Sequence, residues 1–240
     1  MSTYNGEKYL KRQMDTILQE LGPEDELIVS DDSSVDGTVE IIQSYKDKRI
    51  RFFGNNTFKS PVYNSEFALK QAKGEFIFLA DQDDVWLPGR VHKVKEHLLE
   101  NDLVVCNAHI VDQEEKILHE SYFQWKGSRQ GFWKNWKKNS YMGCSMALNR
   151  KMLQAALPFP RKLIMHDVWI GLLAESLGKV YFLDEKLMLY RRHADNVTAS
   201  VDRNDDRLSD FSFWFKIRYR LVLLWQIMKR YLKVVFGRES

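Results

Sequence analysis

The sequence predicts an α/β fold, with a mostly parallel β-sheet covered by helices on both faces. Helical and strand-like patterns alternate along the first 111 residues, and the strand-like runs are short and apolar, as expected for strands buried on both faces. Parallel strands joined by helices produce this alternation. With 240 residues, 44% of them hydrophobic, the chain is long enough to bury one sizeable core.

The first predicted unit is a helix followed by a strand. Apolar residues between Leu10 and Leu21 recur at a spacing that places them on one helical face. The segment GPED at 22–25 then ends the helix, because glycine and proline interrupt helical patterns. The apolar run ELIVSD at 26–31 follows as the first buried strand.

Two similar units, and then one more helix and strand, complete the alternation. Asp36 and Gly37 open the second helix, and Pro88 stands near the start of the fourth, a favoured place for proline. In chain order, the predicted elements are a helix over 38–46, a strand over 49–53, a helix over 63–74, a strand over 75–81, a helix over 87–98 and a strand over 102–111.

Two acidic loops follow predicted strands, at the edge of the sheet where ligands bind in such folds. They are SDDSSVDGT at 30–38 and ADQDD at 80–84, and neither has the glycine pattern of a dinucleotide-binding loop or a P-loop. Asp81, Asp83 and Asp84 repel one another unless a cation offsets their charge. Mg²⁺ and Mn²⁺ prefer oxygen ligands and share their coordination with diphosphates, so the loop predicts a divalent metal in a nucleotide-sugar site.

Charge and cysteine content exclude several classes of protein. The formal charge is +3, but the segment from Phe211 onward holds seven Lys and Arg residues against Glu239, a balance of +6, which leaves −3 for the rest. This distribution argues against nucleic-acid binding. Cys106 and Cys144 lack disulfide-framework or zinc spacing and are predicted to be buried thiols in a reducing compartment. The N-terminal segment lacks the pattern of a secretory signal, which predicts a cytoplasmic protein.

The basic, aromatic-rich segment 206–240 is predicted to be a helical tail outside the main domain, residues 1–205. Its charges interrupt every apolar run before the ~18 residues of a spanning helix are reached. Aromatic rings and cations suit the surface of an anionic bilayer, so we expect peripheral attachment to the inner face of the cell membrane. The alternative is a C-terminal helix packed on the domain, or on the second subunit of a homodimer.

Five blocks of the sequence resemble, in order, the motifs of family 2 glycosyltransferases with the GT-A fold, most closely the bacterial rhamnosyltransferase-like branch. They are STYNGEKYLKRQMDTIL, IVSDDSSVDGT, AKGEFIFLADQDDVW, MHDVWIG and YRRHADN, within roughly residues 1–200. The resemblance implies a metal-dependent, inverting transfer of a sugar, rhamnose being one candidate, from a nucleotide-diphosphate donor. The implied acceptor is a hydroxyl of a glycan or lipid-linked saccharide in cell-surface polysaccharide synthesis.

The resemblance also assigns the donor half of the site. Tyr4 and Asp32 match positions that hold the nucleotide base, Tyr4 by stacking and Asp32 by accepting the imide N–H, with Asp31 as the neighbouring alternative. Asp81 matches the first acid of the DxD motif, which is expected at the ribose hydroxyls. Turn and helix-cap roles are the alternative reading of Asp32 and Asp36.

The metal and the catalytic base follow from the same resemblance. Asp83 matches the second acid of the DxD motif, expected on Mg²⁺ or Mn²⁺ with Asp84 in support, and His193 matches a residue that completes the metal site in several relatives. Asp167 matches the general base, with an ordinary helix-start carboxylate as the alternative. Relatives have Glu-Asp where this chain has His166 and Asp167.

Several alternatives stay open at this point. Relatives carry a β-strand immediately before the STYN-like block, and here Met1 lies inside that block, so the first strand is expected to be missing. Arg191 and Arg192 are alternative diphosphate contacts, and the tryptophans between 125 and 136 serve either as an acceptor platform or as packing. A sugar nucleotidyltransferase and a non-catalytic, transferase-like assembly partner are the competing functions.

Overall fold

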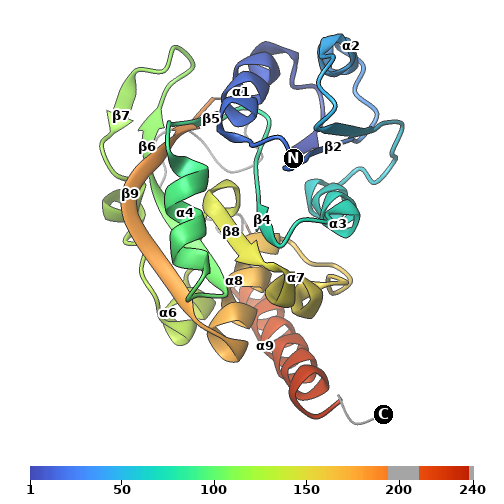
Figure 1. Ribbon diagram of the computed structural model, residues 1–240. Coiled ribbons are helices and arrows are strands. Elements are labelled where there is room, and N and C mark those ends of the chain that lie inside the picture. Colours follow the sequence, from blue (N-terminus) through green and yellow to red (C-terminus); the bar gives the residue numbers. More distant parts are fainter. Residues whose placement is uncertain (194–210, 238–240) are drawn as a thin grey trace.

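The computed structural model describes residues 1–193 and 211–237, which form two adjacent β-sheets with helices around them (Figure 1). The predicted α/β class is confirmed, and each helix and strand predicted up to residue 111 has a counterpart. The two sheets differ in strand direction, and this difference decides where the acidic loops lie.

The first sheet holds three parallel strands. They are β1 (Ser2–Thr3), β2 (Leu27–Asp31) and β3 (Ile50–Phe53). The apolar strand expected to be missing before the STYN-like block is replaced beside β2 by the two residues Ser2 and Thr3, which pair with the end of β2. Backbone groups of β2 that face away from β3 need partners, and the N–H groups of Ser30 and Asp32 donate to the carbonyl oxygens of Met1 and Thr3 at 3.0 Å.

Three helices accompany this sheet. They are α1 (Glu7–Glu20), α2 (Thr38–Ser44) and α3 (Pro61–Gln71). The apolar face of α1 places Leu10, Met14 and Ile17 in one buried cluster with Val29 of β2, as the helical spacing predicts.

The second sheet is mixed, in the order β4-β8-β6-β9-β5, with β7 paired to β6. Its strands are β4 (Phe76–Phe78), β5 (Val85–Trp86), β6 (Leu103–Val111), β7 (Ile117–His119), β8 (Met146–Asn149) and β9 (Val180–Arg191). Among the described pairings of this sheet, β6 with β9 is parallel and the other four are antiparallel. The prediction of mostly parallel pairing is therefore wrong here. Each antiparallel pair includes β7, β8 or β9, which lie beyond residue 111, the end of the last strand predicted from the sequence.

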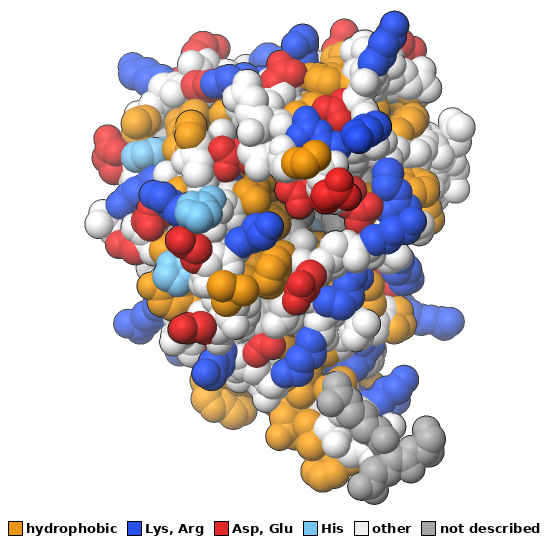
Figure 2. Space-filling view, in the orientation of Figure 1, with side chains coloured by type: hydrophobic (Ala, Val, Ile, Leu, Met, Phe, Trp, Pro, Cys, Tyr) orange, Lys and Arg blue, Asp and Glu red, His pale blue; other side chains and the backbone are white. Residues whose placement is uncertain are grey.

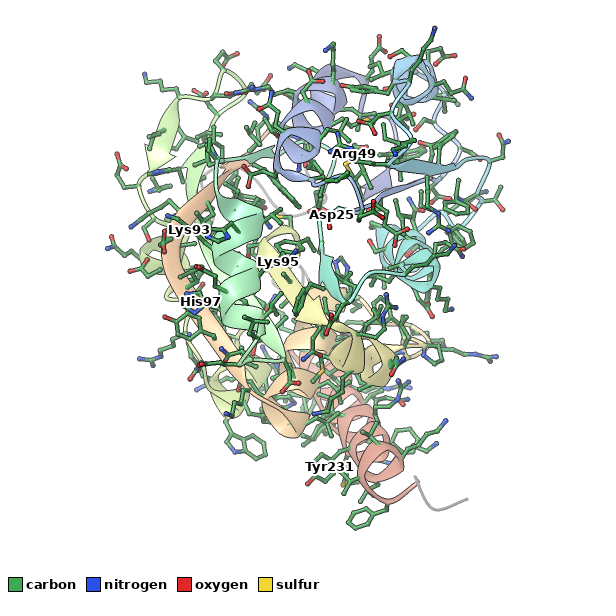
Figure 3. All side chains as sticks on the ribbon, in the orientation of Figure 1. Asp25, Arg49, Lys93, Lys95, His97 and Tyr231 are labelled. Carbon is green, nitrogen blue, oxygen red and sulfur yellow. The ribbon has the colours of Figure 1, made fainter. Side chains whose placement is uncertain are left out.

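Five helices and a short 3₁₀ helix surround the second sheet. They are α4 (Arg90–Leu98), α5 (Tyr122–Lys126), α6 (Phe132–Lys137), α7 (Arg150–Ala156) and α8 (His166–Leu177), with the 3₁₀ helix at Gly143–Ser145. Lys93 and His97 project from one side of α4, and Lys95 projects from the other (Figure 3). The apolar side of α4 packs Val94 and Leu98 into a cluster with β6. Cys106 and Cys144 are both buried and free, as predicted.

The last helix, α9 (Phe213–Phe236), lies at one end of the molecule and packs against α6 and α8 (Figure 1). Its inner face buries Leu223 and Ile227 in the main core. Arg230 donates hydrogen bonds of 2.7 Å to the carbonyl oxygens of Ala155 and Leu157, at the end of α7. The tail therefore packs on the domain through one face, and the boundary predicted between 205 and 206 lies outside the described residues. No described helix combines the length and apolar character that crossing a bilayer requires.

Candidate active site

A cavity of about 890 Å³ lies beyond the ends of β1, β2 and β4 and reaches the start of α8. The side chains that line it come from segments far apart in the chain. All six predicted site residues are among them, namely Tyr4, Asp32, Asp81, Asp83, Asp167 and His193. The fold thus brings the proposed donor residues and the proposed base to one cavity.

The loop after β4 is tied to the loop after β1 by Gln82. The Tyr4 N–H donates to Gln82 Oε1 at 2.9 Å, and Gln82 Nε2 donates to the Tyr4 carbonyl at 3.0 Å. Gly6 allows this contact, because a Cβ there would lie 2.3 Å from Gln82 Oε1. Gln13 of α1 donates to the Asp81 carbonyl at 2.9 Å. Gln82 is not predictable as a site residue from the sequence, since a single amide between two acids forms no recognisable motif.

Asp83 and His193 meet at the cavity wall, with 2.9 Å between Asp83 Oδ2 and His193 Nε2. Arg191, 2% exposed at its side chain, holds the loop in place. Its Nε donates to the Asp83 carbonyl at 2.8 Å, and its backbone N–H donates to Asp84 Oδ1 at 3.0 Å. A carboxylate oxygen beside an imidazole nitrogen is a donor pair that binds Mn²⁺ and related cations, so these two residues fit a divalent metal.

The other two acids of this loop lie next to Cys144. One ligand atom from each of Asp81, Asp84 and Cys144 lies within 4.8 Å of the others. Asp84 is fully buried, and its Oδ2 has no hydrogen-bond partner within the described residues. Burial, reinforced by the charge of Asp83, raises the pKa of Asp84 well above its usual range and that of Asp81 to about 7. The loop therefore favours a bound cation, which would stabilise the ionised carboxylates.

These shifts predict how stability depends on pH. The pKa of Asp81 is about 7 in the folded chain against an ordinary 3.8, so the unfolded chain loses this proton first as the pH rises. Stability should then fall between about pH 4 and 7, by at most about 4 kcal/mol from this group. Urea unfolding at pH 5 and pH 8 in chelator should show a smaller loss for Asp81→Asn than for the wild type. Equal losses in the two proteins would contradict this origin.

At the end of β2, the neighbouring residues Asp31 and Asp32 have different environments. Asp32 lines the cavity, and its two carboxylate oxygens accept the N–H groups of Phe58 at 2.6 Å and Ser60 at 3.2 Å. Asp31 is fully buried, does not line the cavity and accepts both the N–H and the hydroxyl of Ser34. Of the two, Asp32 is therefore the one that faces the cavity.

Tyr4 and Asp36 fall into different environments. The Tyr4 ring is 58% exposed at the cavity, in a position open to stacking. Asp36 accepts the N–H and the hydroxyl of Thr38 and the N–H of Glu7, so it joins the starts of α1 and α2. The turn-and-cap reading of Asp36 is the one that these contacts support.

Asp167 lies in the first turn of α8, facing the cavity. Its Oδ2 accepts a hydrogen bond from Asn139 Nδ2 at 2.9 Å, and its Oδ1 accepts the N–H of Val168 at 2.8 Å. A carboxylate in the first turn of a helix is also favoured by the helix dipole. The geometry is compatible with both readings of this residue, since the carboxylate is held at a helix start and also faces the cavity.

Of the arginines and tryptophans considered as ligand contacts, only some line the cavity. Arg192 lines the cavity and lies over the Trp125 ring, 5.1 Å from its centroid, whereas Arg191 donates to the Asp83 carbonyl in the loop after β4. Trp125 also lines the cavity, unlike Trp133 and Trp136. Trp136 donates through Nε1 to a carbonyl of α9. Arg192 and Trp125 are therefore the members of these sets that can touch a ligand.

Comparison with known proteins gives one family. The profile of the family described as Glycosyl transferase family 2 matches residues 1–157. An uncharacterized glycosyltransferase of Methanocaldococcus jannaschii is 30% identical over 217 residues, which cover 85% of this chain and 73% of that protein. The Escherichia coli protein WfgD, a UDP-Glc:alpha-D-GlcNAc-diphosphoundecaprenol beta-1,3-glucosyltransferase, is 25% identical over 88% of this chain and 84% of its own. The match with an uncharacterized glycosyltransferase of Nostoc, 27% identical over 82% of this chain, spans 64% of that relative's length.

Two solved structures share the fold. S. aureus TarS in complex with UDP-GlcNAc has a TM-score of 0.66 at 18% identity, covering 97% of this chain and 71% of that one. A mannosyltransferase from Pyrobaculum calidifontis, in complex with GDP-Man and Mn²⁺, has a TM-score of 0.59 at 16% identity, covering 78% and 54%. At these identities the likeness concerns the fold, which is the GT-A fold expected from the sequence.

Proposed function

Since the chain belongs to glycosyl transferase family 2, we propose that it transfers a sugar from a nucleotide-diphosphate donor to a hydroxyl of a lipid-linked saccharide, with inversion at the anomeric carbon. The observation that carries the proposal is the convergence of Asp81, Asp83 and His193 with Asp167 in one cavity. Its volume of about 890 Å³ suits a ligand of the size of a nucleotide sugar.

The donor occupies the end of the cavity nearest the first sheet. Tyr4 stacks on the base, Asp32 accepts the imide N–H of the base, and Asp81 accepts hydrogen bonds from the ribose. Arg192 pairs with the diphosphate, since a guanidinium held over an aromatic ring still presents its N–H groups to an anion.

Asp83 and His193 would hold a divalent metal, Mg²⁺ or Mn²⁺, through the oxygen and nitrogen that lie 2.9 Å apart. When bound, the metal supplies positive charge against the diphosphate as that group departs. Arg191 keeps Asp83 in place from behind, through the Asp83 carbonyl. The repulsion between Asp81, Asp83 and Asp84 makes the site more favourable to a cation.

The transfer is a single displacement. Asp167 accepts the proton of the acceptor hydroxyl while that oxygen bonds to the anomeric carbon. The bond from the anomeric carbon to the diphosphate oxygen breaks at the same time, and the nucleoside diphosphate leaves with the electron pair. Attack from the face opposite the leaving group inverts the anomeric configuration.

Relatives suggest the class of acceptor. WfgD and a Campylobacter jejuni protein are both named for acceptors built on a diphosphate-linked undecaprenol, and a Bacillus subtilis relative is named for teichuronic acid biosynthesis. We extend this class to the present chain and place it in cell-surface polysaccharide synthesis. The donor sugar is a hexose or rhamnose.

A donor screen tests the proposal. The purified protein, with Mn²⁺, is incubated with UDP-glucose, UDP-GlcNAc, dTDP-rhamnose or GDP-mannose, and with GlcNAc diphosphate carrying a short alkyl chain. We expect one donor to release its nucleoside diphosphate only when acceptor and metal are both present. Donor binding without release of nucleoside diphosphate in every mixture would instead favour the non-catalytic alternative.

We further propose that the outer face of α9 attaches the protein to the inner surface of the cell membrane. Leu221, Trp225, Met228 and Leu232 are each about half exposed and recur at intervals of three or four residues, which places them on one side of the helix. Hydrophobic side chains are exposed at the end of the molecule where α9 lies (Figure 2). Tyr231 lies at the far end of the same helix (Figure 3). Between Phe213 and Phe236 there are six Lys and Arg residues and no Asp or Glu, a charge that suits anionic lipid.

Vesicle binding tests this attachment. Full-length protein should sediment with phosphatidylglycerol vesicles at low salt and much less with phosphatidylcholine vesicles, because each cation contributes about 1 kcal/mol near an anionic surface. Trp225→Glu should reduce binding by about tenfold, since it puts a charge into the apolar interface.

Gln226→Glu is the matched control for that variant. It adds the same charge one position along the helix from Trp225, outside the set of exposed apolar residues proposed to contact the membrane. It should retain most of the binding. Light scattering measures the oligomeric state of the protein without vesicles. If the wild type is a dimer that does not bind vesicles, and Trp225→Glu dissociates that dimer, this face of α9 binds a second subunit instead of a membrane.

A further inference from the structure

Asn139 is the side chain that holds Asp167, although the two are 28 residues apart. Asn139 Nδ2 donates to Asp167 Oδ2 at 2.9 Å, while Asp167 Oδ1 accepts the N–H of Val168. Each carboxylate oxygen therefore has one hydrogen bond from the protein and further lone-pair capacity. The side-chain direction of Asp167 is thus defined by a bond that comes from a different segment of the chain.

The amide of Asn139 is itself fixed. Its Oδ1 accepts the N–H of Tyr141 at 2.9 Å, which orients the Nδ2 group toward Asp167. Asn139 is 7% exposed, and both Asn139 and Asp167 line the cavity. An amide with both ends engaged loses little further freedom when a ligand binds, so it can hold its partner in one position.

The segment that carries Asn139 is anchored on its far side. The Ser140 hydroxyl donates to Asn135 Oδ1 of α6 at 2.6 Å, and the Tyr141 hydroxyl donates to Glu175 Oε1 of α8 at 2.5 Å. Glu175 also accepts the N–H of Gly131. Because Glu175 and Asp167 are on the same helix, α8 and the Asn139 segment form one unit.

We propose that Asn139 is a positioning residue for the base Asp167, a role that rests on the function proposed above. Its N–H keeps the carboxylate aimed at the acceptor hydroxyl before reaction. During transfer the acceptor proton passes to Asp167, and Asn139 keeps its hydrogen bond to that carboxyl group. In this role the loss of Asn139 should act through Asp167, the side chain to which its Nδ2 group donates.

Other titratable groups surround Asp167, and their titration must be distinguished from the effect of Asn139 on the pH dependence of transfer. They are His166 on α8, Tyr122 on α5, Tyr141 beside Asn139 and Asp81 in the loop after β4. Burial raises the pKa of both tyrosines above their usual range, so neither ionises near neutrality. Asp81 and His166 are present in every variant, so a comparison between variants isolates Asn139.

The decisive variant is Asn139→Asp, which keeps an oxygen for the Tyr141 N–H and replaces the N–H donor with a second carboxylate. With the donor and acceptor that the screen identifies, kcat should fall by about tenfold or more and donor KM should stay within about twofold. The acid limb of the plot of kcat against pH should move to higher pH, since a like charge now faces Asp167. Asn139→Ala should show the same shift to a smaller extent.

Tyr141→Phe is the matched control, because it removes the hydrogen bond to Glu175 from the same segment but leaves Asn139 and Asp167 in contact. It should lower the melting temperature without moving the acid limb. In addition, Asn139→Ala should have no further effect on kcat in a chain that already carries Asp167→Asn.

The outcomes separate the two proposals. If Asp167→Asn is inactive while both Asn139 variants keep the wild-type pH profile, the positioning role is wrong and the base assignment stands. If Asp167→Asn transfers at the wild-type rate, both the base and the role of Asn139 are wrong. Loss of activity in Asn139→Asp together with a weaker donor KM and an unmoved acid limb would also overturn the positioning role.

Discussion

Replacing Asp167 with asparagine is expected to reduce sugar transfer by about 10²-fold or more while donor binding stays unchanged. The amide keeps the size of the side chain and its place in the first turn of α8, but it cannot accept the proton of the acceptor hydroxyl at neutral pH. Single-turnover transfer measures the rate, and calorimetry with the nucleoside diphosphate measures binding.

Asp184→Asn is the matched control for this prediction, because it also replaces a carboxylate with an amide. Asp184 lies on β9, outside the cavity, and its side chain is 71% exposed. It should transfer at close to the wild-type rate. Near wild-type transfer by Asp167→Asn would mean that another group takes the proton and that Asp167 serves only the start of α8.

Replacing Asp83 with alanine is expected to abolish the metal-dependent part of donor binding. The change removes the oxygen that lies 2.9 Å from His193 Nε2, and with it one of the two proposed metal ligands. A loss of about 10²-fold in affinity for UDP or dTDP, or about 3 kcal/mol, is the expected scale for a charge pair at a diphosphate. Calorimetry with Mn²⁺ present and then chelated measures this difference.

His193→Gln tests the second ligand separately. It should weaken metal-dependent binding less than Asp83→Ala, because a neutral ligand contributes less charge than a carboxylate. Circular dichroism and thermal melting should show that both variants are folded. If wild-type affinity for the nucleotide is the same with and without chelator, the metal has no part in donor binding.

The donor half of the site was predictable because its residues follow strands directly. A run such as EFIFLAD is recognisable as a buried strand from composition alone, and in an α/β fold the next residues must lie at the ligand-binding edge. Asp32, Asp81 and Asp83 therefore line the cavity as expected. The first three helices were predictable as well, because their patterns are also local.

The acceptor half depends on long-range packing that local patterns do not encode. The strands β8 and β9 pair with partners far away in the chain, and the direction of these pairings cannot be predicted from the alternation of helices and strands. Asn139 has no motif, and its role follows from a contact across 28 residues. The difference between Arg191 and Arg192 follows from which side of β9 each side chain leaves, as expected for neighbours at the end of a strand.

The packing of α9 on the domain has a consequence for communication between the surface and the base. Arg230 holds the carbonyl oxygens of Ala155 and Leu157, and the Tyr219 hydroxyl of the same helix accepts the N–H of Ile164 at 3.3 Å. These contacts lie at the two ends of the segment 155–164, which precedes α8 and Asp167. On the proposed function, a membrane surface that shifts α9 would also act on the position of Asp167 through these contacts. By thermodynamic reciprocity, an acceptor that binds at Asp167 would then change the affinity of α9 for that surface by the same factor.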